Sequence, residues 1–443
     1  MTSEERKKTK LNAWRSAGKL ALAAALLVAT TAAQAPSGQQ AEVLLQQADA
    51  ALKKEDYAAA AKVLEAYLAQ TPQDYSVKFN LALAYSMTGR QDDAIRLYQE
   101  VLAQQPDLVQ ARQNLGILML QQGNAAQALE QFQQVVDKQP NHWAAQINRA
   151  GALVALNRKA EAEQAYERAL QLKPDHAPTH AAYGQLLASR DPATAEEHLR
   201  RAVELDPSLE DARLDLATVL EARSAAGSGS LEEAEAIYEQ FLESHPDRGD
   251  VRLRLAEIYL QQKRPVDAIR ELEAARAGAP PNLRISEALL DAYVRSKQND
   301  KALALLPELL SQRTGDAELY LLQGSLLMEK RQYASASDSF RRAIELAPQS
   351  PPGYTNLAAA LYLIKDYQGT VAALDKLAAL GKDTAGSYFL RAITLDKLEL
   401  KGPAYDNYQK FLASDEKKNP DQEFQARQRS IVLGRELKRP PLR

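Results

Sequence analysis

Asparagine recurs at a fixed interval in the first half of the chain, at Asn80, Asn114 and Asn148, and again much later at Asn356. A carboxamide carries one acceptor oxygen and two N–H donors, so a row of amides can pair with successive peptide units of an extended chain. Such pairing needs no particular side chain on the ligand. The alternative is that the amides occupy a recurring surface position and bind nothing.

Residues typical of an enzyme site do not form a set in this sequence. It has no glycine-rich phosphate loop, no His-Glu-x-x-His and no Gly-x-Ser-x-Gly. His176 and His180 have a spacing that suits zinc on one helix, but Pro178 marks a helix start and places one histidine in the turn. We therefore expect a structural or exposed role for them, with no catalytic residue, no metal and no cofactor. The sequence predicts that the protein is not an enzyme.

Composition limits the partners. The chain has 443 residues, no cysteine and a net charge of -3; without residues 1–35, which carry six basic and two acidic side chains, the charge of the remainder is -7. Disulfides and thiolate metal sites are therefore excluded. A mildly acidic body argues against nucleic acid or an anionic membrane as the main ligand, because both require a basic face.

Proline marks the elements that must position the asparagines. It returns at intervals of mostly 34 residues, at Pro72, Pro106, Pro140, Pro174, Pro207, Pro246, Pro280 and Pro348. A period of this length indicates stacked helix–turn–helix repeats. Small residues such as Ala82 and Ala94 would let the two helices of a hairpin approach closely, and the aromatic Tyr98 would fill the space between one hairpin and the next.

This pattern closely resembles the tetratricopeptide repeat, with small residues at positions 8 and 20, an aromatic at 24 and proline at 32. The resemblance covers residues 41 to about 418. It gives about eleven repeats, which start at Ala41, Tyr75, Val109, Trp143, Ala177, Glu210, Gly249, Leu283, Ala317, Pro351 and Ala385. The resemblance implies an all-α fold, a right-handed α-solenoid of stacked helix-turn-helix repeats, completed by a C-terminal capping helix and tail over 419–443.

The family's architecture places the first helix of each repeat on the concave face, where some members bind the main chain of a peptide with an asparagine ladder. The resemblance therefore implies a partner-binding groove. Its residues at positions 5, 6 and 9 are Phe79, Asn80, Leu83, Gln113, Asn114, Ile117 and Asn148. Position 6 holds other residues in most later repeats, so the groove should be N-terminal, uncharged and partly apolar. Glu257, Glu318 and Glu329 would make the inner face of the second half more acidic.

The ends of the chain differ from the repeats. Residues 1–35 have a basic region, an apolar run of about ten residues and small residues in order, which predicts a signal peptide or an uncleaved signal anchor. Residues 36–40 are predicted to be a linker. A Gly/Ser-rich insertion at 224–230 is predicted to be a flexible bulge, either tolerated drift or a partner contact. In the capping helix we expect Phe424, Ile431 and Leu437 to face inward, and the four basic residues Arg427, Arg429, Arg435 and Lys438 to face outward.

These observations predict an exported, periplasmic or inner-membrane-anchored scaffold. It would bind protein or peptide segments, in cell-envelope assembly or secretion. Nucleic acid is not expected as a partner, and a membrane only through an uncleaved N-terminal segment. Two alternatives stay open: a rod that self-associates into a homo-oligomer, and a subunit or regulator of an enzyme complex.

Overall fold

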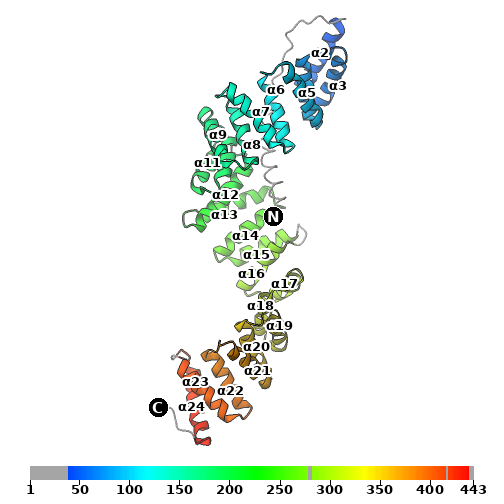
Figure 1. The fold of residues 1–443 in the computed structure, drawn as a ribbon. Helices are drawn as coiled ribbons and strands as arrows, with labels where there is room; N and C mark the ends of the chain where they lie inside the picture. The colour runs from blue at the N-terminus through cyan, green and yellow to red at the C-terminus, as the bar shows by residue number, and fades with distance from the viewer. Residues whose placement is uncertain (1–37, 278–281, 416–417, 439–443) are drawn as a thin grey trace. The chain divides into compact units, whose positions relative to one another are not determined.

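The computed structural model describes residues 38–277, 282–415 and 418–438, and these contain 23 α-helices and no strand (Figure 1). The predicted signal segment, residues 1–35, lies outside the described residues. The chain divides into an N-terminal unit that ends at Phe241 and a C-terminal unit that begins at Leu242. Each unit is described by itself.

The helices follow one another with short connections. In the N-terminal unit they are α2 (Gly38–Lys53), α3 (Tyr57–Leu68), α4 (Tyr75–Met87), α5 (Gln91–Gln104), α6 (Val109–Gln121), α7 (Ala125–Lys138), α8 (Trp143–Ala155), α9 (Lys159–Leu172), α10 (Ala177–Leu187), α11 (Pro192–Leu205) and α12 (Glu210–Ala225). The next helix, α13 (Leu231–Ser244), spans the division. The C-terminal unit continues with α14 (Gly249–Gln261), α15 (Pro265–Ala277), α16 (Leu283–Arg295), α17 (Asn299–Gln312), α18 (Ala317–Glu329), α19 (Tyr333–Leu346), α20 (Pro351–Leu363), α21 (Tyr367–Ala379), α22 (Ala385–Lys397), α23 (Lys401–Ser414) and α24 (Pro420–Glu436).

The repeat boundaries predicted from the sequence agree closely with the helices. From Tyr75 to Ala385, each predicted repeat start is also the first residue of a helix. The first repeat differs, because α2 begins at Gly38 and residues 38–40 of the predicted linker are helical. Each helix from α2 to α12, and each helix from α14 to α24, packs against the next helix in its series. The fold is therefore an α-solenoid of helix–turn–helix repeats, as the sequence predicts.

Small residues allow the two helices of each repeat to approach closely. Ala82 and Ala94, at positions 8 and 20 of the second repeat, are both 0% exposed, and so is Tyr98 at position 24. Tyr98 contacts Phe79 edge to face, with ring centroids 5.6 Å apart. Burial of these apolar side chains at every junction is the main source of stability in such an array.

The turn between the two helices of a repeat has a left-handed residue at position 15 in most repeats. Glycine serves at Gly89 and Gly123, with φ of +83° and +86°. Most other repeats place a non-glycine residue there, with φ between 56° and 65°: Glu55, Asn157, Lys263, Lys297, Arg331, Lys365 and Glu399. These positions are mildly strained, and the packed helices on either side hold them.

The insertion at 224–230 is partly helical. Helix α12 extends to Ala225, and Gly227 (φ +84°) then reverses the chain before Leu231 begins α13. The backbone N–H of Ser228 donates to the carbonyl of Arg223 at 2.9 Å. The longer spacing thus adds about one turn to a first helix and a compact reversal after it.

The capping helix α24 packs on α23, but the prediction of its inward face is wrong for two residues. Phe424 and Ile431 are 66% and 44% exposed, whereas Ala426 and Leu433 are 0% exposed. Only Leu437 packs against the core cluster, as predicted. The reason is register: α24 continues the repeat as another first helix, so Ala426 occupies position 8 and faces α23, while Phe424 at position 6 does not.

Candidate protein-binding surfaces

The three asparagines of the N-terminal unit lie at equivalent places on α4, α6 and α8, but their surroundings differ. Asn114 is 2% exposed, and its Nδ2 donates to the hydroxyl oxygen of Tyr98 at 3.1 Å. Tyr98 is itself buried, and burial raises the pKa of its hydroxyl above the ordinary value. The Asn114 amide therefore satisfies a buried polar group inside the solenoid.

Asn80 and Asn148 have no tyrosine at the equivalent place. The residue sixteen positions before Asn80 is Leu64, and the residue sixteen positions before Asn148 is Phe132, neither of which has a hydroxyl group. Asn148 is 5% exposed. Asn80 is half-buried, and its Oδ1 has no hydrogen-bond partner among the described residues. Of the three amides, Asn80 is the one whose oxygen is screened from water and has no partner among the described residues.

The other predicted groove residues lie in the core. Phe79 and Ile117 are 0% exposed, Leu83 is 4% exposed and Gln113 is 8% exposed. Phe79 and Ile117 belong to one hydrophobic cluster with Tyr98. Positions 5 and 9 of these first helices therefore contribute mainly to packing between repeats. A role for these residues in partner binding stays a prediction.

Sequence reasoning missed Met87, which is 45% exposed at the end of α4. Met87 lies seven residues after Asn80, so the two side chains share one side of the helix. A flexible thioether two turns along the helix from an unused amide acceptor is a combination suited to contact with another chain. The seven-residue spacing was the signal in the sequence that could have identified it.

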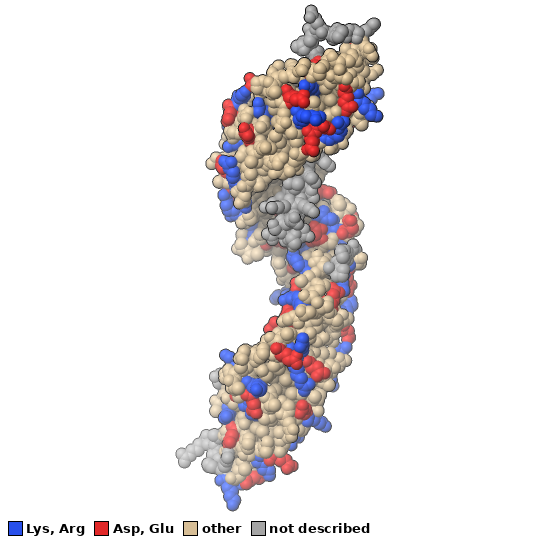
Figure 2. Space-filling view, turned by 45° about the vertical axis from the view of Figure 1, so that its right-hand side comes forward, with Lys and Arg blue, Asp and Glu red and all other residues tan. Residues whose placement is uncertain are grey.

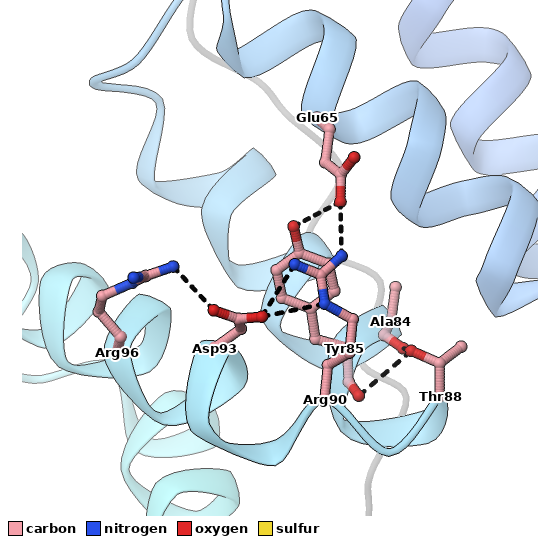
Figure 3. A network of polar contacts seen from close by, with 7 residues as sticks. All are labelled: Glu65, Ala84, Tyr85, Thr88, Arg90, Asp93 and Arg96. Carbon is pink, nitrogen blue, oxygen red and sulfur yellow. Dashed lines mark hydrogen bonds and ion pairs between the residues drawn. The ribbon is translucent and has the colours of Figure 1, made fainter.

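A polar network joins the first repeat to the second (Figure 3). Glu65 on α3 accepts the Tyr85 hydroxyl at 2.6 Å and Nη1 of Arg90 at 2.8 Å. The Arg90 guanidinium lies 3.7 Å from the centroid of the Tyr85 ring and donates to Asp93. The hydrogen bond from Tyr85 is the main cause that holds the pKa of Glu65 below its usual value, while burial raises the pKa of Tyr85 to about 12. This network links two neighbouring hairpins.

The same glutamate recurs at position 25 of other repeats. Glu167 accepts the hydroxyl of Tyr183 at 2.9 Å. Glu273 accepts the hydroxyl of Tyr293 and Nζ of Lys301, both at 2.8 Å. In each case the tyrosine comes from the next repeat, so a carboxylate–tyrosine contact is a repeated structural device here and does not mark a catalytic site.

Charged side chains of both signs are interspersed on the face shown in Figure 2. On the predicted acidic inner face, Glu257 is paired with Arg284 at 2.7 Å, and Glu329 accepts Nδ2 of Asn299 at 2.6 Å. Glu318 is exposed. Of these three glutamates, an ion pair with a described residue therefore offsets the charge of Glu257 only.

Three of the four histidines of the N-terminal unit lie close together and form a cluster: His176, His180 and His198. His176 is the N-cap residue of α10, as Pro178 predicted. Nε2 of His180 lies 2.9 Å from the carbonyl oxygen of Pro174 and must donate to it, and its Nδ1 lies 2.9 Å from Nδ1 of His198. In the neutral pair, His180 Nδ1 accepts and His198 Nδ1 donates.

The surroundings of His176 and His198 disfavour the charged forms of these two side chains. Burial, with smaller contributions from Lys173 and His180, lowers the pKa of His176 to about 4. Burial and His180 also lower the pKa of His198, while Glu197 and Glu167 act in the opposite direction. Below pH 6.5 the unfolded chain therefore binds protons that the folded hairpin of α10 and α11 does not accept.

Stability should accordingly fall as the pH falls from 6.5 toward 4. We expect the N-terminal unit to lose on the order of 1–2 kcal/mol over this range through the two histidines, because their rings are only half-buried. Thermal unfolding at pH 7.5 and pH 5.5 would measure the loss. A variant with His176→Gln and His198→Gln should show a smaller difference between these pH values, and an unchanged difference would contradict this assignment.

Within the described ranges, no group of three histidine, aspartate or glutamate side chains is arranged to hold a metal ion. In the same ranges no helix has the length and apolar character that crossing a membrane requires.

Comparison with known families gives consistent results. Three models described as tetratricopeptide repeat match the chain: one at residues 45–109 and 114–177, a second at 225–280 and 259–326, and a third at 317–350. Together these matches cover more than half of the 443 residues. No curated protein matches the chain.

Several solved structures are similar over part of the chain. The C-terminal part of a TPR repeat-containing protein from Cytophaga hutchinsonii is 17% identical, with a TM-score of 0.45, and the match covers 55% of this chain and 98% of that one. MamA from Desulfovibrio magneticus RS-1 is 20% identical, with a TM-score of 0.37 and coverage of 39% and 99%. YrrB, a TPR protein with an unusual peptide-binding site, is 19% identical, with a TM-score of 0.39 and coverage of 43% and 96%.

Proposed function

Because the chain belongs to the tetratricopeptide repeat family, we propose that it is an exported scaffold that binds extended or helical segments of partner proteins. Repeat solenoids of this kind present long surfaces for protein–protein interaction and are generally not catalytic. Export is supported by the sequence of residues 1–35, in which Lys and Arg precede an apolar run and small residues. The partners would then be proteins of the cell envelope or of a secretion pathway.

The observation that carries the binding proposal is the unused acceptor of Asn80. Its Oδ1 is screened from water and has no partner among the described residues, which costs free energy in the unbound protein. A backbone N–H of a bound peptide would remove that cost. The neighbouring Met87, exposed on the same side of α4, would add apolar contact.

The geometry favours a segment of backbone over a folded surface as the ligand. The Oδ1 atom of Asn80 is screened from water, so neighbouring side chains must move before a partner atom can enter and reach it. An extended strand or one side of a helix is thin enough to do so, and its peptide groups supply the donor without regard to sequence. Specificity would come from the side chains that flank the contact.

We expect Asn80→Ala to weaken partner capture about five- to thirteenfold, since one hydrogen bond is worth about 1–1.5 kcal/mol. The thermal midpoint should stay nearly unchanged, because the amide oxygen makes no internal bond. The measurement is the yield of co-purified protein when the full chain is used to capture partners from the envelope fraction.

Asn356→Ala is the matched control, because Asn356 is half-buried at position 6 of α20 in the C-terminal unit. It should not change capture. Asn114→Ala should instead lower the thermal midpoint, because it breaks the buried contact with Tyr98. Equal capture by wild type and Asn80→Ala would contradict the proposed role of α4, and recovery of partners only from the cytoplasm would contradict export.

A further inference from the structure

The terminal helix α24 exposes three large apolar side chains. Phe424, Ile431 and Val432 are 66%, 44% and 41% exposed, although the opposite side of the helix is anchored by Ala426 and Leu433 at 0%. Single exposed apolar residues are ordinary on protein surfaces, but three on one helix make a patch. The anchoring on α23 means that α24 cannot rotate to bury them without losing its own core contacts.

The residues of this patch are arranged symmetrically about Gln428. Asp421 and Arg435 lie seven residues before and after it, and Phe424 and Val432 lie four residues before and after it. With 3.6 residues per turn, the first pair points within about 20° of Gln428 and the second pair within about 40°. All five side chains are exposed. One strip of α24 therefore carries an acid at one end, a base at the other and an apolar residue on each side of a central amide.

We propose that α24 binds α24 of a second copy of this chain, antiparallel, about a two-fold axis at Gln428. In that pairing Asp421 faces Arg435 of the second copy and Phe424 contacts Val432 of the second copy, each contact occurring twice. The two Gln428 amides meet at the axis, where each can donate and accept. The antiparallel orientation also places the positive end of each helix dipole beside the negative end of the other, which is favourable.

The charged side chains on and near this strip of α24 are consistent with a second α24 as the partner. The side chains of Asp421 and Arg435 make no ion pair with any described residue, so both are free to pair across the axis. Arg427 is paired with Glu423 at 2.5 Å, and Arg429 with Asp396 at 2.5 and 2.8 Å. These two arginines therefore present little uncompensated positive charge to a second α24.

One pair of helices buries less than the roughly 1,600 Å² of a typical stable interface, so the dimer should be weak and concentration-dependent. Sedimentation equilibrium of the full chain from about 1 to 200 µM should show a monomer–dimer equilibrium in the micromolar range. Phe424→Glu should raise the dissociation constant at least about tenfold while the thermal midpoint stays unchanged. Val266→Glu is the matched control, because Val266 is 68% exposed on α15, and it should change neither quantity.

Charge reversal separates this pairing from any other apolar contact. Asp421→Arg and Arg435→Asp should each weaken the dimer, because each places like charges opposite one another twice. The double variant should recover most of the wild-type affinity, because both contacts are restored with reversed sign. A chain that stays monomeric throughout the concentration range, a dimer that Phe424→Glu leaves intact, or a double variant as weak as the single ones would each overturn the proposal.

Discussion

Replacing Phe340 by Ala should lower the free energy of unfolding of the C-terminal unit by about 3–5 kcal/mol. Phe340 is 1% exposed at position 24 of its repeat and packs in a cluster with Ala336, Leu357 and Leu361. Its ring also fills the space that the missing side chain of Gly324 leaves on α18. Truncation would open a cavity at the junction of two repeats, where each repeat depends on its neighbours.

Urea unfolding followed by circular dichroism would measure this loss. Phe424→Ala serves as the control, because the same chemical change at a side chain that is 66% exposed should alter the free energy of unfolding by less than about 0.5 kcal/mol. Similar losses for the two variants would mean that the ring of Phe340 does not hold the repeats together.

Adding one methyl group in Gly324→Ala should destabilise the C-terminal unit by about 1–3 kcal/mol. A Cβ at this position would lie 2.4 Å from Cε1 of Phe340, well inside van der Waals contact. Alanine normally favours a helix over glycine by about 0.5–1 kcal/mol, so intrinsic propensity alone predicts the opposite sign. The steric term should win, because the ring is enclosed and has no free space to enter.

The matched control is Gly386→Ala in α22, where the nearest atom to an added Cβ is Oγ1 of Thr384 at 3.8 Å. That change should leave the thermal midpoint the same or raise it slightly. Combining Gly324→Ala with Phe340→Leu should cost less than the sum of the two single changes, because the smaller side chain leaves room for the methyl group. A rise in thermal midpoint for Gly324→Ala alone would contradict the close approach of α18 and α19.

Most of the fold could be predicted from the repeat period in the sequence. Because proline ends a helix and small residues must recur wherever two helices touch, the spacing located the first residues of helices from Tyr75 to Ala385. The same reasoning identified Tyr98 as a packing residue, and it is 0% exposed. These features can be predicted from a single sequence, because every repeat must end its helices and pack them in the same way.

The candidate site was harder to predict from the sequence, because equivalent positions in different repeats do not have equivalent neighbours. Asn80, Asn114 and Asn148 share position 6, yet only Asn114 finds a tyrosine hydroxyl in the preceding repeat. The sequence could not tell a buried structural amide from an unused one without knowing which side chains meet across the junction.

The sequence by itself determined the kind of element, its length and its register, which follow from backbone chemistry and from the 34-residue period. Only the tertiary structure decided which faces stay open: it buried Phe79 and Ile117 and exposed Met87 and Phe424. The reason is that exposure depends on how closely two neighbouring helices approach and at what angle. Those quantities are set jointly by side chains from different repeats, and no single helical pattern contains them.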